Sequence, residues 1–213
     1  MTNLIVTLTG PSGVGKDTIL NEMYLLAPLP GTPKMITMRT VISHTSRAPR
    51  EYEKDGVDYH FVTVDEFERM VEEDLFVESV VAHGNYYGAA RTEFETDADI
   101  TFLVAEPQGA SMIRAAFPEI TRSIFVLPPR WEDLFLRLKN RGESDEKARG
   151  RIKDSEAWLA NMDDYHSLLV NLTGRQRMSA QALSVYATNE LLMQMSRGAA
   201  MRIRNKLLQE IGR

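Results

Sequence analysis

A glycine-rich stretch near the start of the chain combines residue types that bind phosphate. The stretch GPSGVGKDT occupies residues 10–18 and directly follows the apolar run LIVTLT at residues 4–9. A G-x-x-x-x-G-K pattern between a strand and a helix directs backbone N–H groups, the positive end of a helix dipole and a lysine toward phosphate oxygens. The pattern predicts a nucleotide phosphate site formed by Gly10, Pro11, Ser12, Gly13, Val14, Gly15, Lys16, Asp17 and Thr18.

Position 17 departs from the usual form of such a loop. Asp17, an anion, stands where a phosphate-binding loop usually has a hydroxyl residue that binds Mg²⁺, and Thr18 carries the hydroxyl one place later. Two accounts of the metal are open. Asp17 orients a magnesium-bound water, since hard cations accept carboxylate oxygens, or Asp17 faces away and Thr18 lies near the metal. The residues themselves do not choose between these accounts.

The elements that must position this loop alternate between strands and helices. A continuous apolar run predicts a buried strand at residues 4–9, and further strand patterns lie at residues 35–43, 100–105, 122–127 and 167–171. Helical patterns run from the glycine loop to Pro28 and Pro30, from 108 to 117, from 129 to 142, from 143 to 163, and from 179 to 212 with Gly198 as a weak point. This alternation predicts an α/β fold with a three-layer core, in which helices cover both faces of a parallel sheet.

Residues 43–95 interrupt this alternation. Short strand patterns at 59–64 and 77–82 predict a small, antiparallel α+β lobe, in which HGNYYG (83–88) is a turn and Asp65 caps a helix. The expected domains are therefore a core at 1–42 and 96–213, which includes a helical segment at about 140–163 and a helical C-terminal tail, and an inserted lobe at 43–95.

Composition limits the possible functions. The 213 residues include no cysteine, which excludes a disulfide, a thiol nucleophile and a thiolate metal site. The net charge of −5 argues against general nucleic-acid binding, and no apolar run approaches the roughly 20 residues that span a bilayer. The chain begins with a strand pattern and no basic leader, so we expect a cytoplasmic location. The histidines lack metal-ligand spacing and are expected on the surface or in hydrogen bonds: His44, His60, His83 and His166.

A second group of motifs follows the first helical pattern. SHTSRAPR (43–50) precedes DGVDYHF (55–61), and this pair resembles the guanylate kinase family, which has S-x-T-x-R-x-P-R followed by G-x-D-Y-x-F. Further motifs extend the resemblance over roughly residues 4–173: HGNYYG (83–88), PQGA (107–110), FVLPP (125–129), RLKNRG (137–142) and LLVN (168–171). The resemblance implies a P-loop nucleoside monophosphate kinase that moves the γ-phosphate of ATP to GMP or dGMP, giving ADP and (d)GDP. It also implies that the helical segment at about 140–163 is a lid.

The resemblance implies that the inserted lobe binds the acceptor nucleotide. Arg47 and Arg50 match arginines that clamp the phosphate of GMP, a task that suits guanidinium groups because they stay charged and bind phosphate bidentately. The other matches contact the same phosphate, the guanine edge or the acceptor site: Tyr59 and Tyr87 for the phosphate, Ser43 and Glu78 for the base, and Glu106 for the acceptor site.

Glu78 also has an interpretation from chemistry alone. The Watson–Crick edge of guanine presents two adjacent donors, N1–H and the N2 amino group, and an ionised carboxylate accepts both. Adenine presents an acceptor at N1 and would be repelled. A site that pairs a buried polar group in this way discriminates by roughly 10⁴–10⁵.

The donor side of the implied reaction needs charge neutralisation and no general base. The acceptor is a phosphate whose second pKa is about 6, so it is largely ionised near neutrality. By resemblance Lys16, Arg137, Arg141 and Arg151 are catalytic groups that act with ATP and Mg²⁺, and Arg149 could take the place of Arg151. Asn171 matches a residue near the adenine of ATP.

The chain departs from the family at the acceptor site. Ala89 replaces a hydroxyl residue that touches guanine, so a relaxed base preference is open. LVAEPQG (103–109) replaces L-D-x-D-x-Q-G, so Val104 stands for the first acid and Glu106 for the second. We hypothesise that Asp17 partly replaces the lost carboxylate.

Two other functions remain open from the sequence. The first is a related P-loop kinase for another (d)NMP or for ribose 1,5-bisphosphate, because the G-K-D-[ST] loop also resembles ribose 1,5-bisphosphate kinases. The second is a non-catalytic guanylate kinase-like interaction module, although such modules typically have degraded phosphate loops. We expect small-molecule nucleotides as partners, without nucleic acid or membrane, in a monomer or a homodimer. The tail from about residue 175 is longer than the family usually has.

Overall fold

A five-stranded parallel sheet forms the centre of the protein. The structure is a computed structural model that describes residues 4–26 and 36–211. The strand order is β2-β7-β1-β8-β9, and every neighbouring pair is parallel. The strands are β1 (Leu4–Thr9), β2 (Met38–Thr40), β7 (Ile100–Val104), β8 (Thr121–Leu127) and β9 (Ser167–Val170). The predicted parallel sheet is confirmed.

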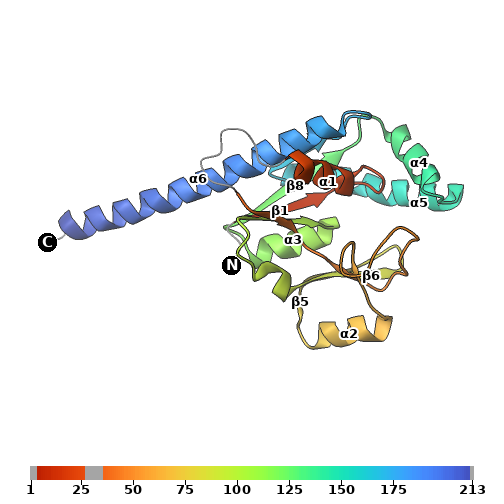
Figure 1. The fold of residues 1–213 in the computed structure, drawn as a ribbon, viewed down its shortest axis with the longest axis horizontal. Coiled ribbons are helices and arrows are strands. Elements are labelled where there is room, and N and C mark those ends of the chain that lie inside the picture. The colour runs from red at the N-terminus through yellow and green to blue at the C-terminus, as the bar shows by residue number, and fades with distance from the viewer. Residues whose placement is uncertain (1–3, 27–35, 212–213) are drawn as a thin grey trace.

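Helices cover both faces of this sheet, as Figure 1 shows. Because side chains alternate along a strand, Leu4 and Val6 of β1 face one layer and Ile5 faces the other. The first layer contains α1 (Lys16–Leu26) and α6 (Gln176–Ile211). The second contains α3 (Pro107–Ala116), which buries Ala110 and Ile113. The three-layer α/β core is therefore confirmed.

A second, smaller sheet lies between β2 and β7 in the sequence. Its order is β4-β3-β6-β5, from β3 (His44–Thr45), β4 (His60–Phe61), β5 (Phe76–Ala82) and β6 (Asn85–Ala90). Helix α2 (Val64–Glu72) packs Phe67 on this sheet, where its ring stacks on Phe76 at 4.6 Å between centroids. The short 3-10 helix η1 (Arg91–Phe94) leads back toward the core. The division of the chain into domains stays a prediction.

Two helices project beside the phosphate loop, at the right of Figure 1. They are α4 (Trp131–Asn140) and α5 (Asp145–Glu156), and α5 continues as the 3-10 helix η2 (Ala157–Asp164). Ser144 caps α5 by accepting a hydrogen bond from the Lys147 backbone N–H at 3.3 Å. The predicted single helix over 143–163 was wrong, because Asn161 has non-helical dihedral angles and the last part is wound as a 3-10 helix.

Several predicted details of the small sheet were also wrong. Thr63, and not Asp65, caps α2, because its hydroxyl accepts from the Glu66 backbone N–H at 3.1 Å. The turn in HGNYYG is limited to His83 and Gly84, and the remaining residues pair as β6. The pairing of β3 with β4 is parallel, so the lobe is not wholly antiparallel.

The observed bounds of three other elements differ from the predicted bounds by a few residues. The strand predicted over 35–43 is three residues long, and residue 35 lies outside the described residues, as do Pro28 and Pro30. Helix α4 starts at Trp131 and not at Pro129. Helix α6 starts at Gln176 and runs through Gly198 without a break. In the part of the chain that the structure describes, no helix combines the length and apolar character needed to cross a membrane.

Candidate active site

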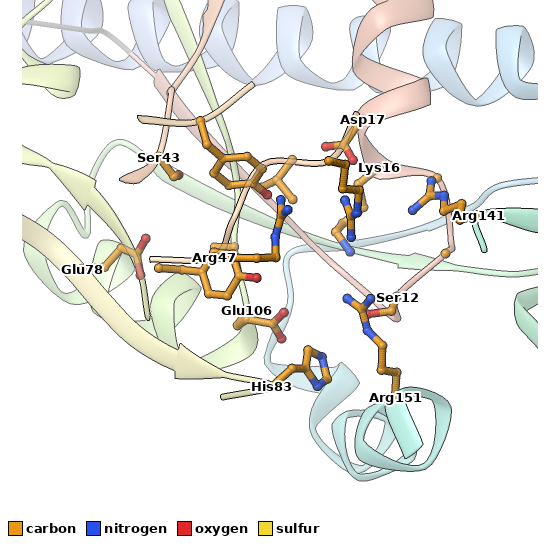
Figure 2. A pocket seen from close by; sticks show the side chains of 17 residues that line it. Ser12, Lys16, Asp17, Ser43, Arg47, Glu78, His83, Glu106, Arg141 and Arg151 are labelled. Atoms are coloured by element: carbon orange, nitrogen blue, oxygen red, sulfur yellow. The ribbon is translucent and has the colours of Figure 1, made fainter. Parts of the chain in front are cut away.

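One cleft lies where the phosphate loop, the small sheet and the two projecting helices meet. Figure 2 shows side chains from all three regions directed into it. The predicted site residues that line this cleft are Ser12, Gly13, Gly15, Lys16, Asp17, Ser43, Arg47, Arg50, Tyr59, Glu78, Tyr87, Glu106, Arg141 and Arg151. The predicted site residues outside its lining are Gly10, Pro11, Val14, Thr18, Arg137 and Asn171.

Glycines give the phosphate loop a shape that other residues would not adopt. Gly10 has φ of +151°, and a Cβ there would lie 2.3 Å from the carbonyl oxygen of Val126 on β8. Gly15 has φ of +95°, and a Cβ there would lie 2.6 Å from Nδ2 of Asn171. The loop therefore depends on glycine at both positions, as the motif predicts.

Lys16 folds over this loop from the first turn of α1. Its Nζ donates to the carbonyl oxygen of Gly10 at 2.6 Å and approaches that of Pro11 at 3.4 Å. Burial lowers the pKa of Lys16, and the carboxylates of Glu106 and Asp17 oppose this lowering. The amino group of Lys16 is thus a donor held directly against the loop.

Arg137 and Asn171 brace the loop from outside the cleft. Both donate to the carbonyl oxygen of Val14, Arg137 from Nη1 at 2.9 Å and Asn171 from Nδ2 at 2.7 Å. Arg137 Nη2 also donates to Thr173, whose hydroxyl donates to Asp133. Asn171 is only 1% exposed. In this structure both side chains hold the loop through Val14, and their roles toward ATP stay predictions.

The acidic side chains near the loop provide oxygen donors for a hard cation. Asp17 and Glu106 line the cleft, whereas Thr18 does not. Burial raises the pKa of Glu106, and Lys16 opposes this rise. Within the described ranges, no group of three or more acidic or histidine side chains could hold a metal alone. Mg²⁺ commonly keeps several waters and takes only one or two carboxylates alongside substrate phosphates, so this set fits it.

Arg47 and Arg50 form a paired cationic cluster on the other side of the cleft. Both make ion pairs with Glu53, Arg47 at 2.9 Å and Arg50 at 3.0 Å. The Arg47 guanidinium also lies over the ring of Tyr59, 5.5 Å from its centroid. The rings of Tyr59 and Tyr87 pack edge to face beside it, with 6.1 Å between their centroids. These groups can surround an anion with donors.

Glu78 lies in the cleft on β5, and one of its two carboxylate oxygens has no hydrogen-bond partner. It is 3% exposed, and its Oε2 has no hydrogen-bond partner. Burial raises the pKa of Glu78 to about 7, although a hydrogen bond from the Ala89 backbone opposes the rise. An unpaired buried acceptor is costly, so this oxygen is placed to receive a donor from a ligand.

The projecting helices contribute two arginines to the cleft. Arg141 follows α4, and Arg151 on α5 pairs with Glu143. Arg149, the alternative to Arg151, instead lies over the ring of Phe135 on the outer side, 4.8 Å from its centroid. The geometry therefore favours Arg151 over Arg149.

Two residues of this region were missed from the sequence. His83 lines the cleft and lies 3.5 Å from Asp154 of α5, which brings the small sheet into contact with the projecting helices. Glu53 pairs with both lobe arginines. The only sequence feature that could have indicated this role for Glu53 is the presence of arginines a few residues away. Glu51, which is exposed, has the same neighbours, so this feature does not single out Glu53.

The fold and the cleft together define a class of protein. A glycine loop after the first strand, a lysine at its end and a second cluster of positive charge across one cleft are the features of a P-loop nucleoside monophosphate kinase.

Comparison with known proteins identifies the family within this class. The family model for guanylate kinase matches residues 1–176. A guanylate kinase of Haemophilus influenzae is 39% identical over 170 residues, covering 77% of this chain and 78% of that protein. One of Pseudoalteromonas translucida is 35% identical over 173 residues, covering 79% of each chain. The crystal structure of guanylate kinase from Anaplasma phagocytophilum matches with a TM-score of 0.69 and 27% identity, over 89% of this chain and 87% of that one.

This chain belongs to the guanylate kinase family. Members of the family are ATP-dependent enzymes that transfer phosphate to GMP, and the predicted resemblance is confirmed.

Proposed function

We propose that this protein binds ATP at the phosphate loop and GMP or dGMP at the small sheet, and transfers the γ-phosphate between them. The observation that carries the proposal is the shared cleft. Lys16 lines it from the loop, while Arg47 and Arg50 line it from the lobe. Two polyanions that repel in water can be aligned only if both are neutralised, and this cleft offers positive charge at both ends.

The acceptor side uses three kinds of contact. Arg47 and Arg50 bind the phosphate of GMP, with Tyr59 and Tyr87 donating hydrogen bonds beside them. Glu78 accepts N1–H and the N2 amino group of guanine, and Ser43 lies at the same edge of the cleft. Ala89 is fully buried and has no side-chain donor or acceptor, so most of the base preference depends on Glu78.

The donor side holds charge at the transferred group. Backbone N–H groups within residues 12–18 receive the phosphates of ATP, and Lys16 leaves the carbonyl of Gly10 to reach the β- and γ-oxygens. Arg141 and Arg151 face the same space and neutralise charge on the transferred group. Arg137 keeps the loop in shape through Val14. No residue is needed as a general base, because the acceptor oxygen is already ionised.

We assign the metal-binding role to Asp17, alongside the phosphates of ATP. When bound, Mg²⁺ would neutralise part of the negative charge of the ATP phosphates. Asp17 lines the cleft and Thr18 does not, which favours the account in which Asp17 orients metal-bound water. Asp17 also brings a carboxylate to the region where Val104 lacks one. An Asp17→Ala variant, which has neither a carboxylate nor a hydroxyl at this position, should therefore need more Mg²⁺ for half-maximal rate.

We further propose that residues 43–95 and about 140–163 act as mobile parts that close over both nucleotides and exclude water. The contact of His83 with Asp154 at the mouth of the cleft supports this, because it links the two parts. We propose a cytoplasmic location, where ATP and GMP are available.

The test is an acceptor panel in a coupled assay of ADP release. GMP and dGMP should be phosphorylated far better than AMP, CMP, UMP or ribose 1,5-bisphosphate. A preference for any other acceptor would overturn the proposed substrate. Absence of ATP binding in calorimetry would overturn the enzyme and favour an interaction module.

A further inference from the structure

Glu53 is a buried carboxylate that no step of the proposed reaction uses. It lies in the loop between β3 and β4, and its side chain is 5% exposed. It does not line the central cleft but an adjoining cavity, so it lies behind Arg47 and Arg50.

Four hydrogen bonds from the two arginines satisfy this carboxylate. Arg47 donates from Nη1 to Oε2 and from Nη2 to Oε1, both at 2.9 Å. Arg50 donates from Nη1 to Oε1 at 3.0 Å and from its backbone N–H to Oε2 at 2.8 Å. Burial alone would raise the pKa of Glu53, but these donors hold it below its usual range.

This arrangement determines where both guanidinium groups lie. Arg47 is held by Glu53 at one edge, and its plane lies near the rings of Tyr59 and Phe61. Without the carboxylate, two cations three residues apart would repel each other and lose their common anchor. With it, both side chains are ordered before the ligand arrives, which lowers the entropy lost on binding.

We infer that Glu53 is a positioning residue for the acceptor phosphate, one that holds Arg47 and Arg50 at the spacing a phosphate requires. The inference rests on the proposed role of these arginines. The inferred role predicts a change in phosphate affinity opposite to the change that the net charge of the site alone would predict. Removing a negative charge beside a phosphate site should tighten phosphate binding by electrostatics alone, whereas loss of positioning should weaken it.

The experiment compares GMP with guanosine, which lacks the phosphate, by calorimetry and by kinetics with ATP. Glu53→Gln keeps the size of the side chain but replaces an acceptor oxygen with an amino group that faces arginine donors. We expect GMP affinity to fall about tenfold or more, with lower kcat, while guanosine affinity and the KM for ATP stay within about twofold. Glu53→Asp, which keeps the charge, should recover part of the GMP affinity and also serves if the first variant does not fold.

Two further variants separate the possible outcomes. Glu51→Gln removes the same charge from an exposed neighbour and should leave GMP affinity unchanged. Arg50→Ala should weaken GMP and not guanosine. If Arg50→Ala has that effect while Glu53→Gln binds GMP as tightly as the native chain or more tightly, the positioning role is overturned alone. If Arg50→Ala leaves GMP affinity unchanged, the proposed phosphate clamp fails, and the role of Glu53 fails with it.

Discussion

Glu78 shows how the surroundings of one residue can couple base recognition to pH. Its pKa is raised to about 7 by burial, so the carboxylate is about half protonated at neutral pH. Only the ionised form accepts both guanine donors. Guanosine affinity should therefore rise about tenfold between pH 6 and pH 8, because the ionised fraction rises from about 0.1 to about 0.9. Guanosine is the right probe, since it has no phosphate to titrate.

The control for this prediction is Glu78→Gln, which has no proton to lose. Its guanosine affinity should be low and independent of pH, and its discrimination between GMP and AMP should be eroded. A native profile that is flat over this range would contradict the base-reading role. The same raised pKa lowers the free energy of unfolding as pH rises from 4.5 to about 7, because the folded chain keeps a proton that the unfolded chain releases.

Lys16 is the residue on which the donor side depends most. Its Nζ contacts only backbone oxygens of Gly10 and Pro11 among the hydrogen bonds described, so removing it should not disturb the fold. Lys16→Ala should lower kcat by about 10²–10³-fold or more, as loss of a transition-state charge contact does. Lys153→Ala, at an exposed position of α5, is the matched control and should keep normal kcat. Near-normal turnover by Lys16→Ala in the coupled assay would refute the role.

At the scale of elements, α3 and β5 fit together through one glycine. A Cβ on Gly109 would lie 2.5 Å from Oε2 of Glu78, so the carboxylate has its place only because Gly109 has no side chain. Gly109→Ala should displace Glu78 and raise the KM for GMP about tenfold or more, with the KM for ATP unchanged. Steady-state kinetics with each substrate varied checks this.

Gly150 offers the matched control for Gly109. It lies inside α5, a Cβ there would meet no atom of another element within 4 Å, and its dihedral angles are not in the left-handed region. Gly150→Ala should leave the KM for GMP unchanged and stabilise the helix by about 0.5–1 kcal/mol, seen as a higher melting temperature. If Gly109→Ala bound GMP normally, the fit between α3 and Glu78 would not matter for the site.

The sequence predicts the bounds and pairing of some elements more accurately than those of others. β1, β7 and β8 are rich in apolar residues and lie in the buried sheet, and they were predicted to within one residue. β3 and β4 are two residues long, so they carry no periodic pattern, and their parallel pairing depends on contacts between distant residues. Thr63 and Asp65 are both good capping residues, and only the observed helix start distinguishes them.

At the scale of the whole molecule, α6 is part of the core although most of it lies beyond the residues that the family model matches. Leu183 is 1% exposed and packs with residues of β1 and α1. Leu183→Ala should lower the free energy of unfolding by about 2–5 kcal/mol. Leu192→Ala, on the same helix but 43% exposed, should cost less than about 1 kcal/mol. Urea denaturation measures both, and equal effects would contradict a core role for α6.

The site as a whole combines residues that are distant in sequence, and this explains what could be predicted. Gly10 to Lys16 form a contiguous motif with its own mechanism, so the loop was evident from local spacing. Arg47, Glu78 and Arg151 came from the family resemblance, because nothing local marks them. The bracing contacts of Asn171 and Arg137 appear only when the fold brings their partners together. Glu53 is close to its partners in the sequence, but only the structure distinguishes it from Glu51.

The central claim is that two nucleotides are held head to head, one by the glycine loop and the other by the lobe arginines. The most direct measurement is a crystal structure with a bisubstrate analogue in which a phosphate chain joins adenosine to guanosine. We predict that the guanosine-side phosphate lies within about 3 Å of guanidinium nitrogens of both Arg47 and Arg50, with guanine on Glu78. A guanosine-side phosphate bound away from both arginines would contradict the account.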